Sequence, residues 1–147
     1  MKPIGIIRTE FQTKDNIPIQ GRLFKHKGKI EVFPEYQEGL KDLDGFSHII
    51  LIYKFHKSKG YKLRVKPFLE NREKGVFATR APRRPNPIGL TIVKLIKITD
   101  NIIEVEGVDM LDKTPLLDIK PYVPQFDHED IKIGWLKDKF VSDSRFG

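Results

Sequence analysis

The sequence predicts an all-β protein, a small single-sheet, mostly antiparallel β-barrel with few short helices. First, several short segments alternate apolar and polar residues or are rich in β-branched residues, which is typical of strands. Second, helical periodicity is scarce, so helices are too few to cover the faces of a parallel sheet. Third, three of the ten prolines lie within six residues, which excludes a helix or a central strand there. A closed antiparallel sheet buries such strands without help from helices.

The strand pattern is clearest in residues 91–98, which are apolar with a period near two. The pair Asp100-Asn101 follows as a turn and residues 102–106 alternate again, so the two segments are expected to form a hairpin. The segments expected to be strands are, in order, Ile4–Arg8, Lys29–Phe33, Phe46–Phe55, Lys62–Pro67, Val76–Thr79, Gly89–Ile98, Ile102–Val108 and Leu116–Ile119.

A helical pattern is found in two segments. Glu35–Leu40 follows Pro34, and Asp130–Phe140 carries a weak apolar stripe. The chain has no internal repeat, and 147 residues suffice for one hydrophobic core. We therefore expect a single domain over residues 1–147.

Three prolines within six residues define a stiff connector, residues 80–87. Pro82, Pro85 and Pro87 exclude a helix or a central strand there, and each favours extended geometry in the residue before it. We expect this connector to join two strands and to present its arginines in fixed directions, because ordering it costs little conformational entropy. A loop that only separates two strands is the alternative.

Composition excludes several classes of protein. Hydrophobic residues make up 39% and charged residues 32% of the chain, so it is neither disordered nor embedded in a membrane in bulk. The longest nearly apolar stretch, Phe46–Tyr53, is too short to cross a bilayer. No signal-peptide pattern opens the chain, and the absence of cysteine excludes disulfides, thiol nucleophiles and cysteine-ligated metals. We expect a cytoplasmic protein without a membrane partner.

The positive charge is concentrated in residues 54–84, called the basic segment below. This segment has 11 basic and two acidic residues, a net charge of +9, whereas the rest of the chain carries −2. A concentrated positive surface attracts polyanions such as nucleic acids. A solvated lysine-rich loop is the alternative explanation.

Several well-known motifs are absent. The chain has neither a dinucleotide-binding nor a P-loop glycine pattern, and it lacks the nucleophile elbow of serine hydrolases. The four histidines do not have the spacing of metal ligands, so no metal site is expected. His48 lies in an apolar strand and is expected to be a hydrogen-bonded core histidine. His56, at the end of that strand, suits a ligand contact.

Residues 107–122 hold a second concentration of functional side chains. Residues 112–115 have the composition of an ordinary turn, which is compatible with a purely structural role. Asp118 lies in an apolar strand context, where an unpaired carboxylate would be costly to bury. We expect a basic partner for it, such as Lys120 or an arginine of the connector, and this pairing favours a functional site.

Four motifs can be compared with known families: DGFSH at 44–48, GVFATRAPRRPNPIGL at 75–90, DMLDKTP at 109–115 and DIKPY at 118–122. Together with the opening Ile4–Arg8, they resemble the TsaA-like family, also called YaeB or TrmO, over about residues 1–122. The second motif is long and unusual, so chance similarity is remote. The remaining residues, 123–147, are expected to form a C-terminal tail with at most a short helix.

The resemblance implies a small single β-barrel that binds S-adenosyl-L-methionine near a homodimer interface and methylates tRNA. The implied reaction is methylation of the exocyclic base nitrogen of threonylcarbamoyladenosine next to the anticodon. A noncatalytic RNA-binding barrel and a methyltransferase acting on a small molecule are the alternatives. The chain departs from the family pattern at two positions, with Ile19 in place of the usual Arg and Lys113 in place of Gly.

The candidate site residues fall into three groups. By the resemblance, cofactor contacts fall on Pro18, Ile19, Gln20, His56, Lys57, Arg80, Leu90, Asp109, Met110, Leu111 and Asp112. Three residues have chemistry suited to the proton and the developing charge of the acceptor, without individual roles assigned: Asp118, Lys120 and Tyr122. The residues expected to contact tRNA are Lys59, Lys62, Arg64, Lys66, Arg72, Lys74, Arg83 and Arg84.

Overall fold

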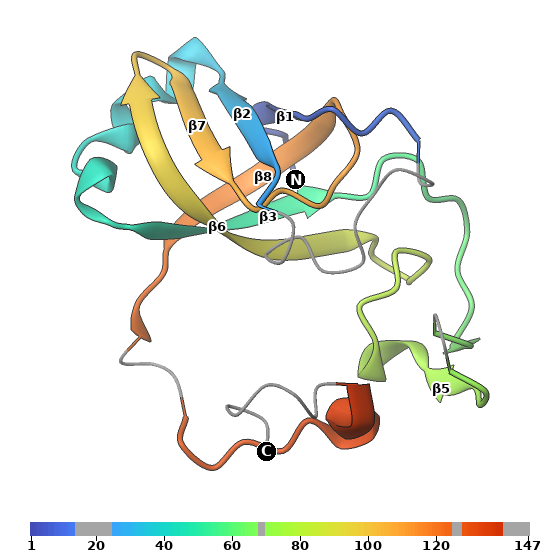
Figure 1. Ribbon diagram of the computed structural model, residues 1–147. Helices are drawn as coiled ribbons and strands as arrows, with labels where there is room; N and C mark the ends of the chain where they lie inside the picture. The colour runs from blue at the N-terminus through green and yellow to red at the C-terminus, as the bar shows by residue number, and fades with distance from the viewer. Residues whose placement is uncertain (14–24, 68–69, 125–127, 140–147) are drawn as a thin grey trace.

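The computed structural model describes residues 1–13, 25–67, 70–124 and 128–139 (Figure 1). Six strands close into a barrel in the order β1-β2-β7-β6-β3-β8, and every neighbouring pair is antiparallel. The barrel strands are β1 (Gly5–Arg8), β2 (Lys27–Val32), β3 (His48–Lys54), β6 (Ile88–Thr99), β7 (Ile102–Glu106) and β8 (Thr114–Pro121). The predicted fold class is therefore confirmed.

The barrel interior is filled by alternate residues of these strands. On β3, Ile49, Leu51 and Tyr53 are buried, while the residues between them face outward. On β6, Val93 is buried opposite Ile49 in the antiparallel register. The core consists of aliphatic and aromatic side chains drawn from all six strands, and truncating one of these to alanine typically costs about 2–5 kcal/mol.

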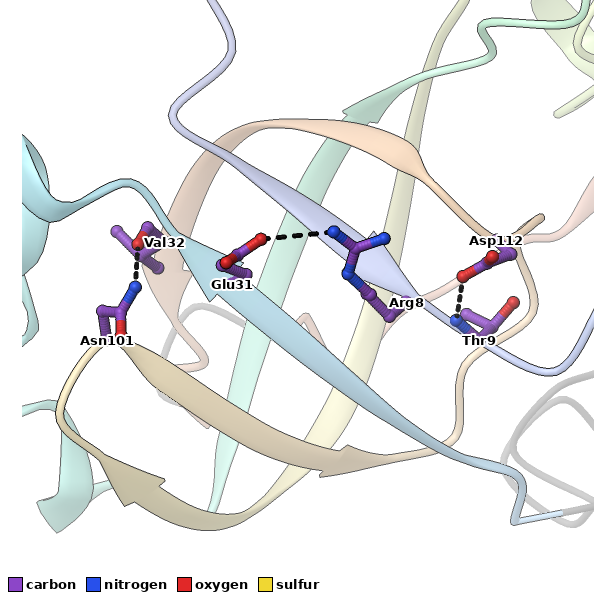
Figure 2. Close-up of polar contacts among 6 residues, drawn as sticks. All are labelled: Arg8, Thr9, Glu31, Val32, Asn101 and Asp112. Carbon is purple, nitrogen blue, oxygen red and sulfur yellow. Dashed lines mark hydrogen bonds and ion pairs between the residues drawn. The ribbon is translucent and has the colours of Figure 1, made fainter.

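Two polar contacts tie neighbouring strands together at one side of the barrel (Figure 2). The Asn101 side chain, in the β6–β7 turn, donates a hydrogen bond from Nδ2 to the carbonyl oxygen of Val32, at 2.8 Å. Arg8 on β1 forms an exposed ion pair with Glu31 on β2, at 3.4 Å. The predicted hairpin around Asp100-Asn101 is thus present, and its turn is joined to β2.

A β-bulge changes which face β8 presents. Leu116 pairs with Tyr53 and Asp118 pairs with Ile52, so Leu117 is an extra residue on β8. Leu116 is fully buried, but after the bulge the alternation is reversed, and Asp118 lies beside the outward-facing Ile52. The outer face of the sheet therefore carries Asp118 and Lys120.

The basic segment forms a small hairpin that is separate from the barrel sheet. The predicted strand Lys62–Pro67 is reduced to β4 (Arg64–Val65), which pairs with β5 (Lys74–Gly75). The prediction of a strand at Val76–Thr79 is wrong, because β5 ends at Gly75 and the 3₁₀ turn η4 (Val76–Ala78) follows. The connector therefore runs from a turn, not a strand, into β6.

The helical segments are 3₁₀ turns. The helical prediction after Pro34 corresponds to η2 (Pro34–Leu40), which is followed by η3 (Leu43–Gly45). Of the helical stripe predicted at the C-terminal end, the described part of the chain contains only η6 (Gly134–Lys139). No helix in the described ranges is long and apolar enough to span a membrane.

Candidate active site

A chain of three hydrogen-bonded side chains lies where β3 ends and β6 begins. Tyr53 and Thr91 point inward from β3 and β6, and Asp109 lies in the loop between β7 and β8. The Thr91 hydroxyl donates to Asp109 Oδ1 at 2.8 Å. Because that hydroxyl has one hydrogen, the Tyr53 hydroxyl must donate to Thr91 Oγ1, also at 2.8 Å. Asp109 is therefore the final acceptor of the chain.

The electrostatics of this group depend on burial and on Arg80. Burial raises the pKa of the Asp109 carboxyl, while the hydrogen bond from Thr91 and the positive charge of Arg80 act in the opposite direction. Burial raises the pKa of the Tyr53 hydroxyl as well, the Asp109 charge raises it further, and Arg80 again opposes. Arg80 is exposed, yet its charge reaches both groups. The site thus pairs a mostly buried acid with a solvent-accessible cation.

Gly89 is required for the packing beneath this group. It pairs with Tyr53 across the β3–β6 ladder, and a Cβ at this position would lie 2.4 Å from a carbon of the Tyr53 ring. The ring of Phe55 packs edge-on against Tyr53, with centroids 5.5 Å apart. Any larger residue at position 89 would displace the tyrosine that begins the hydrogen-bonded chain.

The connector is fixed against the chain segment that follows β3. The Phe55 amide donates to the carbonyl of Pro87 at 2.8 Å, and the Ser58 hydroxyl donates to the carbonyl of Pro82 at 3.1 Å. His56 and Lys57 lie between these two anchor points. Burial and the Lys57 charge lower the pKa of His56 below its ordinary value, which favours the neutral imidazole at pH 7.

The loop before β8 is tied to the end of β1. Asp112 accepts a hydrogen bond from the Thr9 amide at 3.0 Å (Figure 2), and the Thr9 hydroxyl donates to the carbonyl of Met110 at 2.9 Å. Lys113 has φ +66°, the left-handed conformation that glycine adopts without cost. The turn geometry that glycine favours is therefore present here with lysine.

The predicted cofactor residues fall into different environments. Arg80, His56, Lys57 and Asp109 come from the segments that meet at this end of the barrel. Met110 is 3% exposed and Leu111 packs against the core, so their side chains belong to the interior. Leu90 faces outward on β6 and is 45% exposed. Pro18, Ile19 and Gln20 lie outside the described residues.

The predicted catalytic residues lie on the outer face of β8 or beyond its end. Lys120 Nζ is 3.0 Å from Asp118 Oδ2, which confirms the expected partner. The Asp118 side chain is 47% exposed, so its expected burial is wrong, and the bulge at Leu117 is the cause. The Tyr122 amide donates to the carbonyl of His48. His48 is five residues before Tyr53, so Tyr122 lies beside a point about 17 Å along β3 from that tyrosine.

His48 differs from its predicted role as a core histidine. Its side chain is exposed, because it begins β3 in the outward phase, and its Nδ1 lies 2.8 Å from the Ser47 hydroxyl. The expected hydrogen bond is present, but the expected burial is wrong.

The residues predicted to contact tRNA are mostly exposed. Arg84 is an exception, because its Nη1 donates to the carbonyls of Thr79 and Ala81, at 2.8 and 3.2 Å, and so braces the connector. Lys74 is half-buried, with Nζ 5.8 Å from the centre of the Trp135 ring. The exposed members are Lys59, Lys62, Arg64, Lys66, Arg72 and Arg83.

Tyr53 and Thr91 were not among the site residues predicted from the sequence. Both occupy inward positions of strands that were predicted, so strand alternation placed their side chains in the barrel. Their polar groups were the available signal, since a buried hydroxyl needs a partner. The partner, Asp109, is 18 residues from Thr91 in the sequence, and no periodicity connects the two.

Comparison with known proteins supports the resemblance noted from the motifs. Residues 6–128 match the family model of the tRNA-methyltransferase O N-terminal domain. A probable S-adenosyl-L-methionine-binding protein of Pyrococcus abyssi is 52% identical over 153 residues, covering 99% of this chain and 83% of the relative. The mouse tRNA (adenine(37)-N6)-methyltransferase is 40% identical over 134 residues, but this chain covers 31% of it.

A solved structure shows the same fold. The crystal structure of TrmO from Pseudomonas aeruginosa matches 90% of this chain with a TM-score of 0.78 and 40% sequence identity. This chain spans 60% of that chain.

Proposed function

Because the chain belongs to the tRNA-methyltransferase O N-terminal-domain family, we propose that it transfers a methyl group from S-adenosyl-L-methionine to tRNA. The observation that carries the proposal is the group formed by Asp109, Thr91 and Tyr53 with Arg80, the first residue of the connector. The names of the relatives support the same cofactor and the same class of acceptor.

The residues of this group fit the chemistry of the cofactor. The cofactor has an amino-acid tail with a carboxylate and an ammonium, and an adenosine with ribose hydroxyls. Arg80 can pair with the carboxylate through two parallel hydrogen bonds. The Asp109 carboxylate already accepts from Thr91 through Oδ1, and its remaining lone pairs can accept from an ammonium or a hydroxyl. The neutral His56 can donate or accept one further hydrogen bond.

The acceptor that the family suggests is an adenine at its exocyclic nitrogen. The mammalian relatives are named for methylation of adenine 37 in tRNA. We propose that the adenine acted on by this chain carries a threonylcarbamoyl group next to the anticodon. The basic segment supports a tRNA partner. Of its lysines and arginines that are proposed to contact phosphates, six are exposed.

The transfer requires positioning and proton removal. When bound, the cofactor would supply a methyl group from its sulfonium by in-line displacement, and the sulfur would be left as a neutral thioether. The acceptor nitrogen must lose its proton, and the adjacent carbonyl oxygen gains negative character. Asp118 has the chemistry of a proton acceptor, and Lys120, 3.0 Å from it, that of a donor to developing charge. Tyr122 can serve either purpose.

We propose that the active form is a homodimer whose interface completes this site. Leu90 and the Asp118–Lys120 pair lie on the outer face of the sheet, whereas Asp109, in the β7–β8 loop, accepts a hydrogen bond from the inward-facing Thr91. Beside them on β3 and β6, Ile52 pairs with Leu90 and Ile50 with Ile92. Asp118 and Lys120, which carry opposite charges, border this apolar strip. In a dimer with two-fold symmetry, the strip of one copy can pack against the strip of the other, and opposite charges can face each other.

Two measurements test the proposed function in sequence. Titration calorimetry with S-adenosyl-L-methionine should show binding to the wild-type chain and much weaker binding to Arg80→Lys. Incubation with cofactor carrying a radioactive methyl group should then label bulk tRNA. Cofactor binding without labelling of tRNA would favour a different acceptor, and absence of cofactor binding would refute the proposal.

A further inference from the structure

Three large apolar side chains are exposed in the two segments that flank one end of the β4–β5 hairpin. Phe77 is 75% exposed, the largest value for an aromatic residue in the described part of the chain, and Tyr61 and Leu63 are 56% and 60% exposed. The Val76 amide donates to the carbonyl of Leu63 at 2.8 Å. This bond brings the backbone before Phe77 next to the strand that follows Tyr61.

Hydrogen bonds hold the backbone on both sides of Phe77. The exposure of the ring is therefore not the result of a loose segment. Val76 is 1% exposed, and its carbonyl accepts hydrogen bonds from the Thr79 amide and hydroxyl, at 3.1 and 2.8 Å. On the other side, Trp135 Nε1 donates to the carbonyl of Ala78 at 2.8 Å. Figure 1 shows η6 beside this turn, apart from the barrel strands. A fixed, exposed ring is preorganised for contact with a partner.

The charges around this turn favour a polyanion. Lys62 stands between Tyr61 and Leu63, and Arg80 lies three residues after Phe77; both are exposed. An unpaired stretch of nucleic acid combines phosphates with base faces that stack on aromatic rings. The exposed Tyr36 of η2 has the opposite surroundings, since Glu35 and Glu38 line the same pocket.

We propose that Phe77, with Tyr61 and Leu63 beside it, forms a stacking platform for an unpaired base of an RNA loop. This inference rests on the proposed tRNA-binding function and specifies a surface for it. Phe77 supplies the ring that stacks on the base, while the exposed lysines of the basic segment contact the phosphates on either side. Recognition at this platform depends on an unpaired base, and a fully paired helix does not satisfy it.

The test is a binding titration with an anticodon stem–loop RNA that carries 2-aminopurine, a fluorescent adenine analogue, in the loop. Stacking on an aromatic ring quenches this probe. We expect Phe77→Ala to weaken binding by about tenfold or more and to reduce the quenching, with the salt dependence of binding unchanged. Phe77→Trp should preserve both signals, and Tyr36→Ala serves as the matched control with wild-type binding.

The outcomes separate this inference from the proposed function. Absence of RNA binding by the wild-type chain would refute the proposed function and the platform together. Normal RNA binding by wild type and an unchanged affinity in Phe77→Ala would overturn the platform alone. A duplex RNA of the same length should bind wild type and Phe77→Ala equally. Sedimentation showing that Phe77→Ala changes the oligomeric state would assign the ring to a protein interface and overturn the inference.

Discussion

Replacing Thr91 by valine tests the hydrogen-bonded chain at the proposed cofactor site. Valine keeps the shape of threonine but removes the hydroxyl that donates to Asp109 and accepts from Tyr53. A hydrogen bond to a charged group contributes about 1.5–3 kcal/mol, and a buried hydroxyl left without an acceptor costs about 1 kcal/mol. We therefore expect Thr91→Val to lower the free energy of unfolding by roughly 2.5–4 kcal/mol at neutral pH.

The effect of this substitution should depend on pH in a defined direction. Burial raises the pKa of Asp109 above its ordinary value of 3.8, so between that value and the raised pKa the native state binds more protons than the unfolded state. The contribution of Asp109 to stability therefore falls as pH rises through this window. Thr91→Val removes a bond that favours the charged form and raises the pKa further. The loss of stability caused by Thr91→Val should therefore be larger at neutral pH than at about pH 4.

Denaturant unfolding at several pH values measures this effect, with Thr114→Val as the control. Thr114 is 2% exposed and donates to the carbonyl of Leu111 at 2.6 Å, so the substitution removes a buried hydrogen bond without affecting a carboxylate. Its destabilisation should be independent of pH over the same range. Equal pH dependence in the two variants, or wild-type stability in Thr91→Val, would refute the assignment of Asp109 as a buried acid held by Thr91.

Three further predictions concern the proposed site and surfaces. Arg80→Lys and Asp118→Asn should each reduce methyl transfer by about a hundredfold or more, while circular dichroism shows a folded chain. Lysine keeps the charge of Arg80 but cannot form its two parallel hydrogen bonds, and asparagine removes the charge of Asp118; near-normal turnover removes that residue from the site. The double variant Lys59→Gln, Lys62→Gln should weaken tRNA binding, with cofactor binding unchanged in calorimetry. The slope of log affinity against log salt concentration should become shallower by roughly 0.7–0.9 for each phosphate that is no longer neutralised. An unaltered slope would identify the basic segment as a solvated loop. Ile92→Glu should convert the homodimer to a monomer in sedimentation equilibrium, since it places a charge in the apolar strip; an unchanged mass would move the interface elsewhere.

The sequence was sufficient to predict the barrel because strand alternation is a local signal. Residues 91–98 and 102–106 form the expected hairpin, and the scarcity of helical pattern matches the short 3₁₀ turns. The strand prediction was wrong where a segment with a strand-like pattern has no neighbouring strand to pair with. Val76–Thr79 has β-branched residues, but pairing ends at Gly75, and the Thr79 side chain closes a turn onto Val76. Pairing partners are set by tertiary structure and cannot be read from propensity.

Predicting side-chain orientation required information that alternation does not contain. Leu116 is buried, so simple alternation placed Asp118 inside the barrel as well. One extra residue on β8 reverses the phase and brings Asp118 to the outer face, beside Ile52. Nothing in the composition of this segment marks the bulge. The ion pair with Lys120 was predicted correctly, because residues two apart on a strand share a face whichever face it is.

The measurement that tests the central claim most directly is mass spectrometry of nucleosides from tRNA incubated with the chain and cofactor bearing a deuterated methyl group. Two tRNA preparations should be compared, one containing threonylcarbamoyladenosine next to the anticodon and one with unmodified adenosine there. We predict a labelled methyl group on the threonylcarbamoylated nucleoside in the first preparation and none on adenosine in the second. Labelling of unmodified adenosine, or no labelled nucleoside in either preparation, would contradict the account.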